Sequence, residues 1–235
     1  MPPLDTKLRN DLEKVIVKAR DVAEKGSRNS LTGTLAVSEP KPHEHLSDED
    51  KDLRRRLRAR ARQLGDRRDP RTDAHEIDHL VAECAYEHWH RMLFARFLVE
   101  NDLLIHPEEE EAVNLEDCEE LAKEEDARDA WELAERYAAR MLPQIFRPDA
   151  PALKMTLAPE CRMELEELLD SLEKDVFTAI DSLGWVYQFW QKNRKKTINK
   201  SGNKIGSDEL PAVTQLFTEH YMISFLLDNT LGAWW

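Results

Sequence analysis

The chain has 235 residues, of which 41% are hydrophobic and 34% charged, so it can bury a core beneath a heavily charged surface. Its formal net charge of −13 at pH 7 excludes a surface that is uniformly attractive to nucleic acid or to an anionic membrane. Only 7 glycines occur, fewer than the turns of an α/β nucleotide-binding core usually need. Composition therefore favours an all-helical fold.

The cysteines and the N-terminus indicate a cellular setting. Cys84, Cys118 and Cys161 are odd in number and far apart, so they form neither a disulfide framework nor a CxxC metal site. The first ten residues, MPPLDTKLRN, contain no apolar signal region, and no run approaches the roughly 18 apolar residues of a membrane span. We expect a reducing, cytoplasmic setting and no membrane partner.

The first part of the chain predicts three helices. Residues 5–25 have apolar side chains at helical spacing, with Asp5 as the N-cap and Gly26 as the stop. A polar stretch at 27–46 predicts a linker, after which Ser47 caps an Arg-rich helix that reaches Gly65. Residues 73–101 have the longest apolar stripe and predict the central core helix.

The second part also has helical patterns. An acidic segment and then an amphipathic helix fill 108–141, up to Pro143. An irregular connector follows at 148–159 and a helix at 160–182. Residues 184–193 hold four aromatics without a polar face, which predicts an element that is buried or that awaits a partner. Residues 194–207 predict a basic Gly/Ser loop, with a short helix at Pro211 and a last helix at 219–233. The expected fold class is mainly α, an irregular multi-helix arrangement.

Charge is distributed very unevenly. Residues 51–71 carry ten Lys or Arg against three Asp, whereas residues 107–137 carry three Lys or Arg against fourteen acids. Residues 191–204 carry six basic residues and no acid, which makes this segment the better candidate for DNA contact. The candidates are Lys192, Arg194, Lys195, Lys196, Lys200 and Lys204. The Arg stretch at 54–68 is a second candidate, but it is also explained as a solvated helix face that pairs with the acidic segment.

The sequence HEIDH at 75–79 matches the zinc metalloprotease pattern. On a helix, His75 and His79 would share one face and hold zinc while Glu76 acts as the base. However, Asp78 occupies a position that is normally uncharged, and the preceding residues are charged rather than strand-like. We therefore keep this interpretation only as a remote alternative and predict no metal ligands and no catalytic residues in the chain.

The end of the chain carries a family resemblance. LGWVYQFWQ (183–191), DELPAVTQLFT (208–218) and the helix YMISFLLDNTLGAWW resemble the large, single-chain, adenine-specific DNA methyltransferases. The match is closest to the BREX phage-exclusion type and its fused restriction–modification relatives. AYEHWHRMLFARFLVEND (85–102) is similar to the N-terminal helical region of the same family.

In that family the TQ-x-FT segment, called motif X, lies against the S-adenosylmethionine pocket and precedes the catalytic core. The resemblance therefore implies that Thr214, Gln215, Phe217 and Thr218 flank the methionine end of the cofactor. Helix-start amides and a threonine hydroxyl are suited to binding a carboxylate. Glu219 stands where the family often has proline.

Two motifs that the family needs for catalysis are absent from these 235 residues. Neither the acid-Pro-x-x-Gly-Ser-Gly cofactor loop nor the Asn/Asp-Pro-Pro-Tyr/Phe motif, which holds the flipped adenine, occurs. The resemblance therefore implies a helical N-terminal portion that precedes an α/β core lying outside this sequence, in the same polypeptide or on a second chain. S-adenosylmethionine would bind to the full enzyme and not to this chain alone.

These observations predict three segments: an N-terminal helix and linker (1–46), a helical domain (47–182) and the motif X-like region (183–235). The expected role is DNA contact and one wall of the cofactor site in a methyltransferase of a phage-defence or restriction–modification system. Other defence proteins are possible partners. The alternative is a stand-alone helical module that binds protein or DNA.

Overall fold

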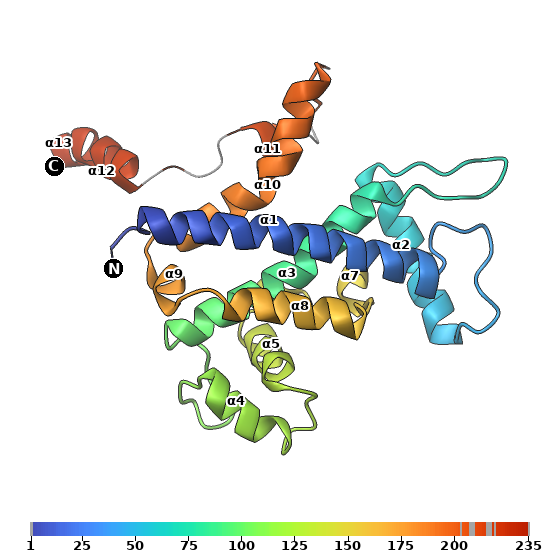
Figure 1. The fold of residues 1–235 in the computed structure, drawn as a ribbon, viewed down its shortest axis with the longest axis horizontal. Coiled ribbons are helices and arrows are strands. Elements are labelled where there is room, and N and C mark those ends of the chain that lie inside the picture. Colours follow the sequence, from blue (N-terminus) through green and yellow to red (C-terminus); the bar gives the residue numbers. More distant parts are fainter. Residues whose placement is uncertain (1, 203, 207–209, 215–217, 219, 235) are drawn as a thin grey trace. The chain divides into compact units, whose positions relative to one another are not determined.

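The computed structural model describes every residue except 1, 203, 207–209, 215–217, 219 and 235. Its described residues are mainly helical and form no strand, only the isolated bridges Arg68–His75 and Ile105–Ala112, so the expected fold class is confirmed (Figure 1). No helix in the described part of the chain is long and apolar enough to span a bilayer.

The chain divides into two compact units. One is Ala19–Asp170, and the other combines Met1–Lys18 with Ser171–Trp235, so helix α1 (Thr6–Asn29) contributes to both. These units do not test the three segments expected from the sequence, which remain a prediction.

The unit of residues 19–170 continues from α1 through a π-helical turn and then seven helices among its described residues. These elements are η1 (Ser30–Thr34), α2 (Asp48–Leu64), α3 (Asp78–Glu100), α4 (Leu115–Ala122), α5 (Ala130–Met141), α6 (Pro143–Phe146), α7 (Pro151–Lys154) and α8 (Pro159–Asp170). The other unit contains α9 (Lys174–Thr178), α10 (Ser182–Ser201), α11 (Leu210–Val213), α12 (His220–Asn229) and α13 (Leu231–Trp234).

Local sequence signals set several of these bounds. The hydroxyl of Ser47 accepts a hydrogen bond from the Asp50 amide at 3.0 Å, which completes the capping box that starts α2. Gly65 ends α2 with φ of 106°, a conformation that favours glycine. Both predicted ends of the Arg-rich helix are therefore confirmed.

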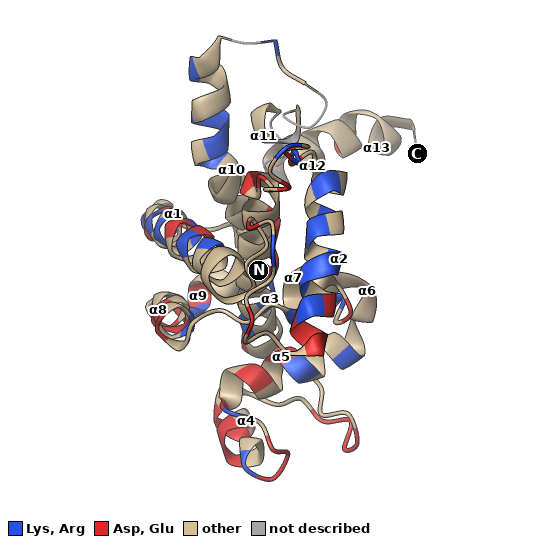
Figure 2. Ribbon diagram, turned by 90° about the vertical axis from the view of Figure 1, so that its right-hand side faces the viewer, with Lys and Arg blue, Asp and Glu red and all other residues tan. Residues whose placement is uncertain are grey.

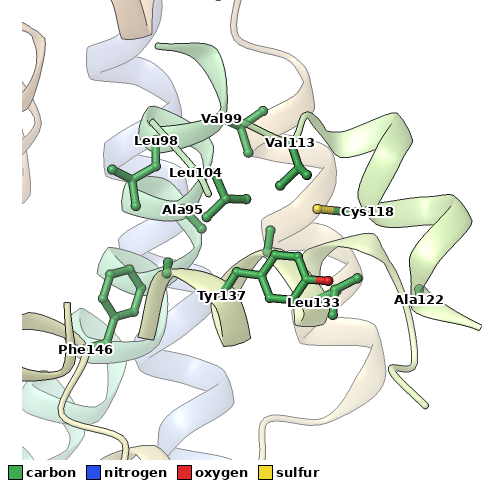
Figure 3. Packing of buried hydrophobic residues seen from close by; sticks show 12 residues of the cluster. Ala95, Leu98, Val99, Leu104, Val113, Cys118, Ala122, Leu133, Tyr137 and Phe146 are labelled. Carbon is green, nitrogen blue, oxygen red and sulfur yellow. The ribbon is translucent and has the colours of Figure 1, made fainter. Parts of the chain in front are cut away.

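Helix α3 is the centre of the larger unit, as predicted, and contacts α2, α5, α7 and α8. Beside it, a cluster of buried side chains fills the space between α3, α4 and α5 (Figure 3). Tyr137 lies fully buried in this cluster, with the ring of His106 packed edge-on at 5.3 Å. The Tyr137 hydroxyl donates a hydrogen bond to Glu125. One aromatic side chain thus joins α5 to the loops that flank α4.

Two predicted boundaries in the second half of the chain were wrong for identifiable reasons. The helix expected over 160–182 is interrupted between α8 and α9. The basic loop expected over 194–207 is helical up to Ser201, because lysine and arginine are good helix formers and no Gly or Pro intervenes. Gly202, with φ of 67°, supplies the left-handed residue that ends α10.

The predicted stop at Gly26 was also wrong, since α1 runs through it to Asn29. Gly26 faces α8: a Cβ atom built there would lie 2.3 Å from Cys161 Sγ, far inside contact distance. The Cys161 thiol in turn lies 3.5 Å from the carbonyl oxygen of Val22. The glycine therefore permits close helix packing instead of ending the helix.

Gly26→Ala tests this packing by the sign of its effect. In an exposed helix this substitution would raise the free energy of unfolding by up to about 1 kcal/mol. Overpacking against Cys161 should instead lower the free energy of unfolding by about 1–3 kcal/mol. Urea unfolding monitored by circular dichroism measures the difference. Gly26→Ala combined with Cys161→Ala should recover part of the loss. A single variant as stable as the parent would contradict the close approach.

Candidate nucleic-acid interface

Helix α10 combines an aromatic first half with a basic second half. Phe189 and Trp190 are 8% and 4% exposed, and the Trp185 ring stacks on Phe189 with centroids 5.5 Å apart. The guanidinium of Arg9, on α1, lies 4.7 Å from the Trp185 ring centroid. The predicted aromatic element is thus partly buried, and it packs against the first part of α1 in the same unit.

Asp181 adds hydrogen bonds that hold the start of α10 to the N-terminal segment. One carboxylate oxygen accepts a hydrogen bond from the Leu4 amide at 2.7 Å, and the other accepts one from Trp185 Nε1 at 2.9 Å. Ile180 and Pro2 add a backbone hydrogen bond of 3.2 Å. The N-terminal segment therefore fixes the base from which the basic half of α10 extends.

The basic half of α10 presents lysines at a regular spacing. Lys192, Lys196 and Lys200 are exposed and follow one another at four-residue intervals, which places them along one side of the helix about 6 Å apart. Lys204 is exposed just beyond the helix end, and we call these four residues the lysine stripe. α10 contains no acidic residue, and blue positions recur along it in Figure 2.

The six predicted DNA-contact residues are therefore not equivalent. Arg194 and Lys195 are half-buried and lie off the stripe. Lys192 pairs with Glu13 of α1. Sequence reasoning missed Glu13, because the two residues are 179 positions apart and nothing local signals the pair. Like charges four residues apart on a helix repel one another, so a polyanion placed along the stripe would relieve that repulsion.

Of the four predicted cofactor residues, the structure describes two. Thr214 is exposed, and its Oγ1 donates a hydrogen bond of 2.9 Å to the carbonyl of Leu210, in α11. Thr218 is exposed as well. Gln215 and Phe217 lie outside the described residues, as does Glu219. The structure therefore does not assemble a cofactor wall from the four.

Helices α12 and α13 expose apolar side chains. Phe225, Leu231 and Trp234 are 64%, 66% and 86% exposed. The other large exposed apolar residues here are Tyr221, Met222, Ile223, Leu226 and Leu227. So many neighbouring apolar side chains are unusual on the surface of a protein that functions without a binding partner.

The Arg-rich helix α2 is the rival basic surface, and much of its charge has a structural role. Arg54 is buried and donates a hydrogen bond of 2.9 Å to the carbonyl of Ala36. Arg60 Nε lies 3.0 and 2.9 Å from the two carboxylate oxygens of Glu83 on α3, and Nη2 donates a further hydrogen bond to the same carboxylate. Figure 2 shows α2 rich in basic positions and α4 rich in acidic ones, but the described ion pairs of α2 are not made with the acidic segment.

The HEIDH pattern does not form a metalloprotease site. α3 begins at Asp78, so His75 precedes the helix and does not share one helical face with His79. The His75 amide donates to the carbonyl of Ser38, and a Glu76 carboxylate oxygen accepts from the Arg67 amide at 3.2 Å. No group of three or more potential metal ligands occurs among the described residues. The backbone at residues 75–79 therefore contradicts the zinc metalloprotease interpretation, which needs His75 and His79 on one face of a helix.

Comparison with known proteins points to one class. Over part of its length the chain is related to adenine-specific methyltransferases. It is 29% identical over 100 residues to the adenine-specific methyltransferase PglX of Lacticaseibacillus casei (strain Zhang), which covers 40% of this chain and 8% of that protein. It is 31% identical over 71 residues to the adenine-specific methyltransferase BrxX of Escherichia coli O9:H4 (strain HS), covering 30% of this chain and 6% of that protein.

The chain therefore matches only a small fraction of the length of either relative. No family model matches the chain. No solved structure matches it either.

Proposed function

We propose that the chain is a helical portion of an adenine-specific, S-adenosylmethionine-dependent DNA methyltransferase of a phage-defence or restriction–modification system. The observation that carries this proposal is the partial similarity to two relatives that are both adenine-specific methyltransferases. Within the enzyme, the chain contacts DNA and is not catalytic by itself, because its sequence lacks the glycine-rich cofactor loop and the Asn-Pro-Pro-Tyr type of motif.

DNA contact is assigned to the lysine stripe on α10. Its ammonium groups are exposed and no acidic residue interrupts them on the helix. Binding along a phosphate backbone releases counterions and is independent of base sequence. The net charge of −13 restricts such contact to this local basic surface. The chain would thus hold the duplex, and base recognition would lie in other parts of the enzyme.

A fluorescence anisotropy titration of a short duplex with this chain at several salt concentrations tests the proposal. The logarithm of the association constant should fall linearly with the logarithm of the salt concentration, with a slope of about −2.7 to −3.6 for three or four phosphate contacts. Binding that does not depend on salt, or no binding at low salt, would contradict DNA contact by this surface.

The motif X-like segment is proposed to supply one wall of the cofactor site in the complete enzyme. Thr214 and Thr218 are exposed on either side of residues 215–217. With Gln215 and Phe217 they would flank the methionine end of S-adenosylmethionine once a catalytic core closes the site. Calorimetric titration of this chain alone with S-adenosylmethionine should therefore show no binding at micromolar concentrations. Tight binding would show that the site is complete without a core.

The catalytic core itself is the proposed partner, in cis or on a second chain. The exposed apolar residues of α12 and α13 are suited to pack against it. Sequencing of the encoding locus should reveal an acid-Pro-x-x-Gly-Ser-Gly sequence followed by Asn-Pro-Pro-Tyr in the same or an adjacent frame. Other proteins of the same defence system are further candidate partners.

The alternative function is a stand-alone helical module that binds protein or DNA, and solution behaviour separates the two. A module adapted to act alone should sediment as a single species. A portion of a larger enzyme should self-associate through the apolar side chains of α12 and α13. Phe225→Asp should suppress that self-association.

A further inference from the structure

A cavity in the unit of residues 19–170 has the features of a small-molecule site. Its volume is about 520 Å³, within the range of roughly 300–1,000 Å³ that is usual for ligand pockets. Side chains from α3, α5 and α8 line it, together with the segment that joins α7 to α8. This cavity shares no residue with the lysine stripe or with the motif X-like segment.

The lining of the cavity is rich in guanidinium groups. Five arginines line it against the two carboxylates of Glu132 and Glu135. The five are Arg91, Arg128, Arg136, Arg140 and Arg162. Guanidinium groups bind phosphate and carboxylate oxygens by paired hydrogen bonds, so the lining favours an anionic ligand.

Three of these arginines already have close acidic partners. Arg128 Nε lies 2.6 Å from Asp129, Arg136 Nη2 lies 2.9 Å from Glu132, and Arg162 Nε lies 2.8 Å from Glu166. Arg140 is exposed and makes no ion pair within the part of the chain that the structure describes. Arg140 and the remaining N–H groups of Arg91 and Arg162 are therefore the donors available to a ligand.

Buried polar atoms with unused hydrogen-bonding capacity meet at this cavity. Considering the described residues alone, Arg91 Nε, Glu135 Oε1 and Arg162 Nη2 have no hydrogen-bond partner, and neither has His88 Nε2. Arg162 Nη2 is 3.5 Å from Glu135 Oε1, and Arg91 Nε is 4.0 Å from Glu135 Oε2, both too long for good hydrogen bonds. Native proteins rarely leave several buried polar atoms unsatisfied at one place, so these atoms point to a ligand.

The available atoms include acceptors as well as donors. Burial lowers the pKa of His88 to about 4, so its imidazole is neutral at physiological pH. A neutral imidazole has one nitrogen that can accept a hydrogen bond, and we assign this role to Nε2, which has no hydrogen-bond partner among the described residues. Glu135 Oε1 is a second acceptor. A ligand that carries only an anionic group would satisfy the arginines but not these two atoms.

We propose that the cavity binds a nucleoside monophosphate or a closely similar nucleotide. Its phosphate would bind to Arg140 and to the unused N–H groups of Arg91 and Arg162. The N–H groups of its base would donate to His88 Nε2 and Glu135 Oε1. This combination of an anionic group with N–H donors on a flat ring supplies partners for both the unused donors and the unused acceptors of the lining. The proposal does not depend on the methyltransferase assignment.

Isothermal titration calorimetry of the full chain tests the proposal with the four nucleoside monophosphates, inorganic phosphate and the four nucleosides. At least one monophosphate should bind about tenfold more tightly than inorganic phosphate and than its own nucleoside, since both halves of the ligand contribute. Equal affinity for inorganic phosphate would overturn the base-binding half of the proposal. Failure of every monophosphate to bind at millimolar concentrations would overturn the whole.

Arg140→Gln tests whether the nucleotide binds in this cavity. Arg140 is exposed, so its replacement leaves the buried packing unchanged. Affinity for the monophosphate should fall by about tenfold when one charge-assisted hydrogen bond is removed. Arg55→Gln is the matched control, since Arg55 lies exposed on α2 and does not line the cavity. The proposal predicts unchanged affinity for the control. An equal loss in both variants would indicate nonspecific attraction and would overturn the site.

Discussion

Replacing Lys196, Lys200 and Lys204 with glutamine should flatten the salt dependence of DNA binding by about 2.7 units of slope, because each phosphate that is no longer neutralised removes about 0.9. These three ammonium groups are exposed, and they form no ion pair with any residue that the structure describes. Affinity at about 0.1 M salt should fall by at least about a hundredfold. Lys192 is left intact because it pairs with Glu13 and so helps to hold α10 against α1.

The matched control replaces Lys7, Lys14 and Lys18 with glutamine. These residues are exposed on the first part of α1, in the same unit, and their replacement changes the net charge by the same amount. Anisotropy titrations should show a nearly unchanged slope for this control. Equal losses in the two triple variants would mean that DNA responds to total charge, and the assignment to the lysine stripe would then be wrong.

Tyr137→Ala should lower the free energy of unfolding by about 3–5 kcal/mol, the cost typical of removing a large buried aromatic ring. The ring is fully buried in the cluster between α3, α4 and α5, so its removal would leave a cavity (Figure 3). Urea unfolding followed by circular dichroism measures the loss.

Tyr137→Phe separates the ring from its hydroxyl. It keeps the packing against His106 and removes only the hydrogen bond to Glu125, so it should cost about 1 kcal/mol. If both variants lost the same stability, the hydroxyl and not the buried ring would be holding this cluster together.

Sequence patterns predicted the fold class and the central helix because both depend on local periodicity. The Ser47 cap and the Gly65 stop follow from backbone chemistry within a few residues and were confirmed. Gly26 looked like the same stop signal but serves close packing on Cys161, which is 135 positions away. A pattern read along the chain does not contain such a contact.

In the candidate sites, too, the sequence predicted what depends on local composition and not what depends on tertiary packing. The basic composition of 191–204 was visible in the sequence, but its helical form separates the exposed Lys196 and Lys200 from the half-buried Lys195. HEIDH matched a motif whose chemistry needs a helix, and the structure begins that helix at Asp78. Glu135 and Arg162 gave no sequence signal at all, because only tertiary packing brings them to one cavity.

Ultraviolet cross-linking of this chain to a duplex that contains 5-bromouracil, followed by peptide mass spectrometry, would locate the DNA surface on the chain itself. If α10 carries that surface, the cross-linked peptides should map to residues 192–204 and should disappear in the triple lysine variant. Cross-links confined to the Arg-rich helix α2 would contradict this assignment and would move the DNA surface to the other compact unit.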